Sequence, residues 1–248
     1  MSFDKLEGKG FFTKEIEQAL LNGEVDLAVH SHKDLETTQP EGLHIAAVSY
    51  REDASELLLM RKSATDSNEP WNLKKNAIIG TSSARRKAQI LAQRPDLEIK
   101  ELRGNVPTRI DKLRQGHYDA ILLARAGVLR LELDLSDLET VVLDPTSFIP
   151  APAQGVLGLQ TRVDDAVSTE ILQKLHHADV AKRIGLERSV LRQMDGGCQL
   201  PLGVFCIGNH VHVSFSTAAT SAATNSVYDY VEGKELELAQ HIVQDLKK

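Results

Sequence analysis

The sequence predicts an α/β protein with a smaller α+β part at its C-terminal end. Strand-like and helix-like segments alternate from Asn76 to about Ala124, which is the pattern of βαβ units and of a parallel sheet. The apolar run Val25 to Val29, broken only by Asp26, indicates a further strand buried on both faces. Beyond Val211, two β-rich runs precede an amphipathic helix from Leu236 to Leu246, which predicts the α+β part.

Length and charge limit the class of protein. The 248 residues are enough for two or three compact domains, and 42% of them are hydrophobic. The net charge is −6 and the pI is about 5.9. This balance argues against nucleic acid or an anionic membrane as the partner, so any anion site must be a local cluster of Arg and Lys.

Targeting and metal signals are missing from the sequence. It has no run of about 18 or more apolar residues, and its first residues lack the apolar core of a secretory signal. We therefore expect a cytoplasmic protein. No Cys and His spacing resembles a zinc site, and the two cysteines, Cys198 and Cys206, are too few for a disulfide framework.

The first part of the chain brings a polar segment to the end of a strand. A basic loop with Lys5 and Lys9 precedes a helix for which Thr13 is the expected N-cap. After the strand Val25 to Val29 come five polar residues that end at Asp34. A carboxylate next to Lys33 and two histidines can stay ionised or give up a proton. The alternative is an ordinary polar turn.

The middle of the chain places arginines at the starts of helices. The segment Gly80 to Ser83 precedes a helix predicted from about Ser83 to Gln93, with Arg85 and Arg86 in its first turn. The helix dipole disfavours cations there, so this placement indicates a bound anion that hydroxyls, backbone N–H groups and guanidinium groups hold together.

A second junction repeats this arrangement. Asn105 is the expected N-cap of a helix with Pro107 in its first turn, and Arg103 and Arg109 lie on either side of the helix start. Arg130 follows the next strand. Each arginine alone could be a solvated surface residue. Together they would converge on one cleft suited to carboxylates, because successive strands of a parallel sheet end at the same edge.

The last third contains the two cysteines. We expect a strand from Val156 to Gln160, a helix that starts at Asp164 or Asp165, and another capped by Asp179. This second helix ends before Gly196, Gly197 and Cys198. Two glycines make the Cys198 thiol accessible, so it is the candidate for covalent chemistry. Cys206 lies in an apolar run and is expected to be buried.

Six segments, taken in order, resemble the porphobilinogen deaminase (hydroxymethylbilane synthase) family. They are VDLAVHSHKD, IGTSSARR, LRGNVPTR, YDAILLARAGVLRL, PAPAQGVLG and GGCQLPLG, and the resemblance extends from about Lys5 to the C-terminus. It implies two α/β domains similar to type II periplasmic binding proteins and a small α+β domain. The implied boundaries are 1–57 with 152–175 for domain 1, 58–151 for domain 2 and 176–248 for domain 3.

The resemblance also implies an activity. The family joins four porphobilinogen molecules head to tail, releases an ammonia each time and produces hydroxymethylbilane. Its cofactor is dipyrromethane, which the resemblance places on Cys198 as a thioether, and its catalytic carboxylate falls on Asp34. We expect a monomer whose partner is the small-molecule substrate, with neither nucleic acid nor membrane involved and without a metal.

Further site residues follow from the same resemblance. Those expected to hold the cofactor are Ser31, Lys33, Thr81, Ser82, Ser83, Arg85, Arg86, Arg103 and Gly104. Those expected to bind substrate are Lys5, Lys9, Arg109, Arg130 and Gln154.

One departure from the family pattern concerns the start of the chain. The family begins with a βαβ unit that this sequence does not contain, so we expect an exposed sheet edge and exposed apolar surface in domain 1. Three hypotheses follow: an active deaminase, a noncatalytic member of the family, or a two-lobed protein that binds small anions.

Overall fold

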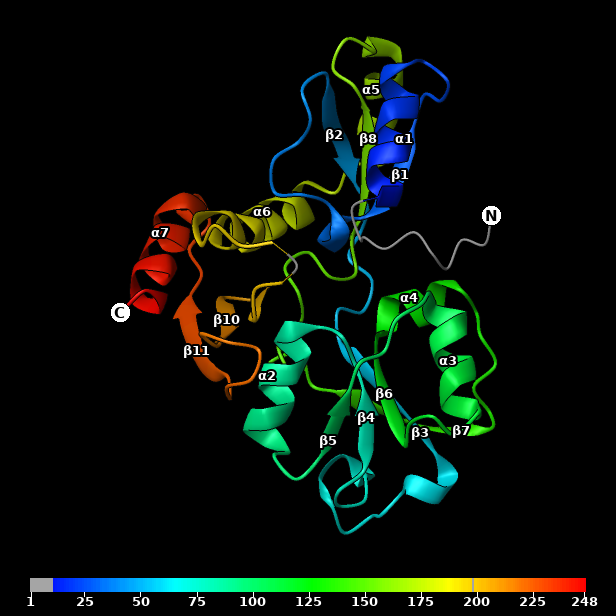
Figure 1. Cartoon of the computed structure of the whole chain (residues 1–248). Coiled ribbons are helices and arrows are strands. Elements are labelled where there is room, and N and C mark those ends of the chain that lie inside the picture. The colour runs from blue at the N-terminus through cyan, green and yellow to red at the C-terminus, as the bar shows by residue number, and fades with distance from the viewer. Residues whose placement is uncertain (1–10, 198) are drawn as a thin grey trace.

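The structure is a computed structural model that describes residues 11–197 and 199–248. The chain forms three β-sheets, each with helices beside it (Figure 1). The strands are β1 (Ala28–Ser31), β2 (Leu43–Val48), β3 (Glu56–Arg61), β4 (Ile78–Gly80), β5 (Glu98–Lys100), β6 (Ala120–Ala124), β7 (Leu138–Leu143), β8 (Leu157–Arg162), β9 (Leu202–Ile207), β10 (His210–Phe215) and β11 (Thr224–Asp229). The α-helices are α1 (Phe11–Leu21), α2 (Ala84–Gln93), α3 (Val106–Arg114), α4 (Arg125–Arg130), α5 (Ala166–Gln173), α6 (Ala178–Gln193) and α7 (Glu235–Leu246).

The first sheet has the order β1-β8-β2, and all its pairs are antiparallel. The strand expected at Val25 to Val29 begins later, at Ala28, and only one of its faces is buried. Its buried side chains are Ala28 and His30, whereas Val29 is 53% exposed. Two-face burial was therefore wrong, because Leu20 of α1 packs on the face with Ala28 and the face with Val29 is exposed. Among the described residues, β1 is an edge strand, and Leu27 and Val29 are 41% and 53% exposed.

The second sheet has five strands in the order β5-β4-β6-β3-β7. The expected parallel pairing is correct for β5, β4 and β6. However, β3 lies between β6 and β7 and runs antiparallel to both, so the sheet is mixed. Sequence alternation missed this because β3 precedes the alternating segment. Alternate residues of β3 enter two buried clusters, with Leu58 and Met60 on one face and Leu57 and Leu59 on the other.

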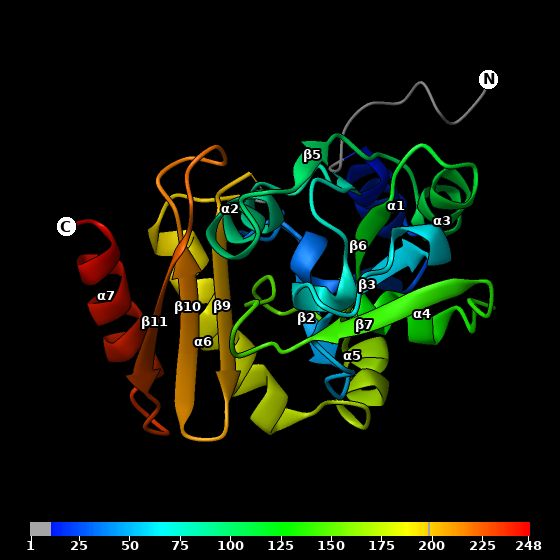
Figure 2. The ribbon, with the colours of Figure 1, turned by 90° about the horizontal axis from the view of Figure 1, so that it is seen from below.

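The third sheet has three antiparallel strands in the order β11-β10-β9, and α6 and α7 pack against it (Figure 2). Cys206 on β9 is 2% exposed, which confirms the expected buried position. The α/β class with a small α+β part is also confirmed. Each sheet has a buried cluster of its own, which supports the three predicted domains; their boundaries remain a proposal.

Helix starts follow local capping chemistry in three cases. The side chains of Ser83, Asn105 and Asp165 accept a hydrogen bond from a backbone N–H in the first turn of α2, α3 and α5. Asn105 was the expected cap, and Asp165 was one of the two residues expected to start its helix. Two expected caps were wrong. Thr13 lies inside α1, and Asp179 lies in the first turn of α6 after the N-cap residue His177.

The three parts meet at the carboxylate of Glu187 on α6, which is fully buried. It accepts two hydrogen bonds from Arg51, at 2.6 and 3.2 Å, in the segment that joins the first sheet to the second. It also accepts the backbone N–H groups of Ala153, in the returning linker, and of Cys206 on β9. This single side chain therefore connects all three parts.

Candidate active site

A cavity of about 370 Å³ lies where the three parts meet. Its walls come from the segment after β1, the first turns of α2 and α3, helix α4, the linker 151–156 and the segment after α6. The charged or flexible residues that line it include Lys33, Asp34, Arg109, Arg130, Gly155 and Gly197. Its volume is in the range of small-molecule sites.

Asp34 lies at the end of a short 3₁₀ helix, His32–Asp34, that directly follows β1. The backbone N–H of His32 donates to Val156 O at 2.9 Å, and this bond ties the segment to the linker. Asp34 is exposed and lines the cavity, as expected. Burial and the nearby charge of Arg188 lower the pKa of His32 to about 4, so this imidazole is neutral. The charged neighbour of Asp34 in this segment is therefore Lys33.

Lys33 is half-buried beside Asp34. Its Nζ atom donates to Gln154 Oε1 at 3.3 Å. Burial lowers its pKa to about 8, although the neighbouring Asp34 carboxylate opposes the shift. Lys33 is therefore mainly a cation at neutral pH and loses its charge in mildly alkaline solution.

Arg109 and Arg130 are two further charged residues of the cavity lining. Arg109 Nε donates to Gly104 O at 2.7 Å, and Arg130 Nη2 donates to Gly155 O at 2.8 Å. Burial and the charge of Arg86 lower the pKa of Arg109, while Asp34 opposes the shift. A guanidinium group has five N–H donors, so these bonds orient the side chains and leave donors for a ligand.

Arg85 and Arg86 also line the cavity, but their guanidinium groups bind inside the protein. Arg85 Nη2 lies 2.6 Å from Glu56 Oε1, and Arg86 Nη2 lies 2.6 Å from Glu56 Oε2. Arg85 also donates to Ile149 O at 2.8 Å, and Arg86 donates to Leu122 O at 3.0 Å. Their positions at the start of α2 are thus explained by a protein carboxylate.

Glu56, the first residue of β3, is fully buried. Burial alone would raise its pKa, but Arg86 and Arg85 outweigh that effect and lower it to about 2. The Arg85–Glu56–Arg86 trio consequently keeps one net positive charge in the cavity wall. Sequence analysis missed Glu56; the available signal was a charged residue at the head of an otherwise apolar strand.

The remaining expected residues divide into two groups. Ser31, Ser83 and Gly104 line the cavity. Among the described residues, Thr81, Ser82, Arg103 and Gln154 do not line it. Ser82 Oγ donates to Leu102 O at 2.8 Å, and the fully buried Gln154 donates to Ala54 O at 2.8 Å. These two side chains support the wall from behind.

Three expected site residues, Lys5, Lys9 and Cys198, lie outside the described residues. Gly197, which directly precedes Cys198 in the sequence, lines the cavity. Among the residues that the structure describes, no group of three His, Cys, Asp or Glu side chains is placed to hold a metal ion. None of the helices in the described ranges combines the length and apolar character needed to span a bilayer.

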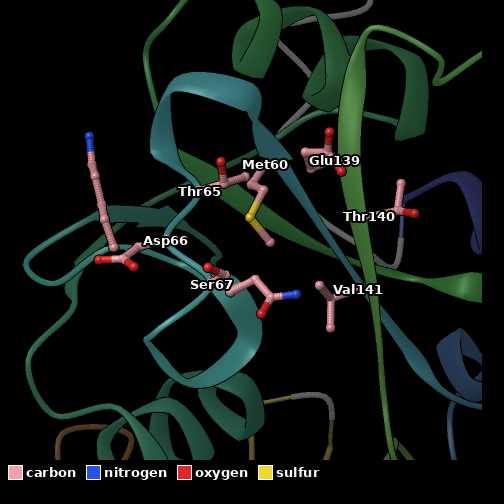
Figure 3. A pocket seen from close by; sticks show the side chains of 9 residues that line it. Met60, Thr65, Asp66, Ser67, Glu139, Thr140 and Val141 are labelled. Atoms are coloured by element: carbon pink, nitrogen blue, oxygen red, sulfur yellow. The ribbon is translucent and has the colours of Figure 1, made fainter.

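A second hollow of about 540 Å³ lies between β7 and the segment after β3 (Figure 3). Its lining includes Asp66, Glu139 and Lys74. Lys74 Nζ pairs with Asp119 Oδ1 at 3.0 Å. With two acidic side chains and one paired lysine, this hollow suits an anionic ligand less well than the cavity at Asp34.

Comparison with known proteins identifies the family. Residues 1–170 match the family model described as "Porphobilinogen deaminase, dipyromethane cofactor binding domain". The chain belongs to the porphobilinogen deaminase family. It is 47% identical over 203 residues to a protein of Oceanobacillus iheyensis named porphobilinogen deaminase, a match that covers 82% of this chain and 64% of that protein. It is also 43% identical over 232 residues to the same-named protein of Syntrophobacter fumaroxidans, covering 94% and 70% respectively.

The chain thus spans less than two thirds of the length of the first of these curated relatives. Among solved structures, it is similar to the periplasmic VFT2 domain of Bordetella pertussis BvgS, with 16% identity and a TM-score of 0.41 over 71% of this chain and 72% of that one. The likeness of the first two domains to periplasmic binding proteins remains a prediction from family membership.

We predict that Glu56→Gln lowers the free energy of unfolding by about 3–5 kcal/mol, because it leaves two buried arginines without a counter-charge. Urea unfolding at pH 7 measures the change. Glu98→Gln is the matched control: Glu98 pairs with Lys100 on the surface, and its loss should change stability by less than about 0.5 kcal/mol. Equal effects of the two substitutions would contradict the prediction.

The difference in stability between wild type and Glu56→Gln should depend on pH. The folded-state pKa of Glu56 is depressed from 4.5 to about 2, so its stabilising contribution is complete above pH 4.5 and is lost as the pH falls toward 2. The stability gap between wild type and Glu56→Gln should therefore narrow from pH 4.5 downward. A constant gap would mean that folding does not shift the pKa of Glu56.

Proposed function

We propose that this chain is a hydroxymethylbilane synthase that condenses four porphobilinogen molecules head to tail with release of ammonia. The observation that supports this most directly is the position of Asp34 in a cavity whose wall also presents Lys33, Arg109 and Arg130. We further propose that it acts as a cytoplasmic monomer, with no nucleic acid or membrane partner.

The cavity suits a dipyrromethane cofactor attached to Cys198. Pyrrole units of this type have acetate and propionate side chains, and the cavity offers cations for them. The trio of Arg85, Arg86 and Glu56 adds one more net positive charge to the wall. Gly197 lines the cavity, and Cys198 is the next residue. When bound, the cofactor would supply the pyrrole carbon to which the first substrate is joined.

The residues that would hold the cofactor and substrate follow from the lining. Lys33, Arg109 and Arg130 would bind carboxylates through charge-assisted hydrogen bonds. Ser31 and Ser83 would add hydroxyl groups, and Gly104 lets a ligand approach the backbone. Thr81, Ser82, Arg103 and Gln154 would act by supporting this wall. Lys5 and Lys9 are proposed to cover the substrate.

Asp34 can perform the acid–base work of the reaction. In its acid form it would give a proton to the amine that leaves as ammonia. As a carboxylate it would stabilise the positive charge left on the substrate and accept a hydrogen bond from the pyrrole N–H. Lys33 and Arg109 are near enough to influence it electrostatically, since the charge of Asp34 affects the pKa of both.

The first test is the intact mass of the purified chain with and without Cys198→Ser. We expect wild type to gain the mass of two linked pyrroles and the variant to lack it. Cys206→Ser is the control, because Cys206 is buried and burial raises its pKa to about 11. If wild type stays unmodified after incubation with porphobilinogen, the noncatalytic or anion-binding hypothesis replaces the proposal.

We predict that Asp34→Asn lowers the rate of porphobilinogen consumption by about 100-fold or more, because an amide neither donates a proton to the amine nor stabilises a cation. Asp26→Asn is the control, since Asp26 forms a surface pair with Arg162 at 2.9 Å. A steady-state assay of both variants measures the difference. Similar rates for Asp34→Asn and wild type would remove Asp34 from the mechanism.

We predict that the KM for porphobilinogen rises about tenfold as the pH increases from 7 to 9, because Lys33 loses its proton near pH 8 and with it a charge-assisted bond to a substrate carboxylate. Lys33→Arg keeps its charge over this range, so its KM should stay nearly constant. The comparison also removes the effect of titration of the substrate amine. Parallel curves for the two proteins would contradict the role of Lys33.

A further inference from the structure

Helix α6 extends from the C-terminal sheet to the segment that contains Asp34 (Figure 1). Its apolar face packs against β9 and α7, with Leu186 and Val190 fully or almost fully buried. Its C-terminal end continues to Gly196 and Gly197, and both Leu191 and Gly197 line the cavity. The helix therefore joins the C-terminal wall of the cavity to its catalytic side.

Arg188 makes this connection from the middle of α6. Its Nη1 atom donates to His32 O at 2.9 Å, and its Nη2 atom donates to Leu35 O at 3.1 Å and to Glu36 O at 2.6 Å. These carbonyl groups lie before and after Asp34 in the chain. One guanidinium group thus fixes the backbone on both sides of the catalytic carboxylate.

The part of helix α6 that carries Arg188 is also held in place. The adjacent Glu187 is fully buried and binds Arg51, Ala153 and Cys206. Ala153 belongs to the linker that lines the cavity, and the N–H of His32 binds Val156 O in the same linker. The segment with Asp34 is therefore held between the linker on one side and α6 on the other.

We propose that Arg188 is a positioning residue that sets the location of Asp34 relative to the cavity wall formed by the end of α6. The inference rests on the proposed function in one respect, which is that Asp34 does the chemistry. In this proposal Arg188 acts through the backbone of residues 32–36, to which its three described hydrogen bonds go. Its loss should impair turnover more than substrate binding.

The helix provides a matched control in Arg183. This arginine is also half-buried, and its Nη1 atom donates to a backbone carbonyl, Gly208 O, at 2.8 Å. Its guanidinium lies 5.0 Å from the centre of the Tyr230 ring. Arg183→Gln therefore removes a similar set of interactions from the same helix, but within the C-terminal part alone.

The test compares Arg188→Gln, Arg188→Lys and Arg183→Gln with wild type by two measurements. The first is hydrogen–deuterium exchange of peptides that contain residues 30–37. We expect the amides of His32 and Leu35 to exchange about tenfold faster or more in Arg188→Gln, part of that protection to return in Arg188→Lys, and Arg183→Gln to match wild type there. This measurement does not require an active enzyme.

The second measurement is kcat and KM for porphobilinogen. We expect kcat of Arg188→Gln to fall on the order of 10- to 100-fold while KM changes little, with partial recovery in Arg188→Lys. An unchanged kcat, or equal exchange and kcat effects in Arg183→Gln, would overturn the proposal. If wild type is inactive, the proposed function fails, and the exchange comparison still decides whether Arg188 holds the segment. If Arg188→Gln does not fold, Arg188→Lys alone is compared with wild type and Arg183→Gln in both measurements.

Discussion

The arrangement of the three parts depends on the buried carboxylate of Glu187. It binds one group from the segment between the first two sheets, one from the returning linker and one from the third sheet. Each part has a core of its own, and two small apolar clusters lie between the parts, one with Val48, Val156 and Ile184 and one with Ala54, Ile149 and Phe205. Apolar contacts are non-directional, so the directional bonds of Glu187 add the geometric constraint that these clusters lack. A carboxylate in the interior requires all its partners, and this requirement defines one geometry. Arg51, the charged partner, also lies over the Phe205 ring, 4.7 Å from its centre.

The shape of the cavity depends on how the three parts are arranged. Its lining comes from separate parts of the chain, and most of its cations are held by a bond to a backbone carbonyl or a buried side chain before any ligand arrives. Such preorganisation reduces the entropy lost when a charged ligand binds. Asp34 is also preorganised, because the backbone of its segment is held by hydrogen bonds while its carboxylate remains exposed.

Local chemistry was predictable from the sequence, and long-range pairing was not. The cap Asn105 depends on a neighbour three residues away, and the structure confirms it. The place of β3 in the second sheet depends on pairing with residues 60 or more positions away, and no local pattern encodes it. Arg85 and Arg86 show the same limit. Their need for an anion was visible, but a protein carboxylate 29 residues away satisfies it for Arg85. The bonds of Arg188 to the backbone of residues 32–36 could not be predicted either, because every sequence has backbone carbonyls.

The Arg85–Glu56–Arg86 trio has a consequence for how this sequence can vary. Replacing any one of the three with a neutral residue changes the charge balance of a cluster in which Glu56 is fully buried and both arginines are about 5% exposed. A single substitution in the trio should therefore destabilise the protein, whereas a simultaneous replacement of all three residues need not. We therefore expect the residues at positions 56, 85 and 86 to be either all retained or all replaced together when this protein is compared with its relatives.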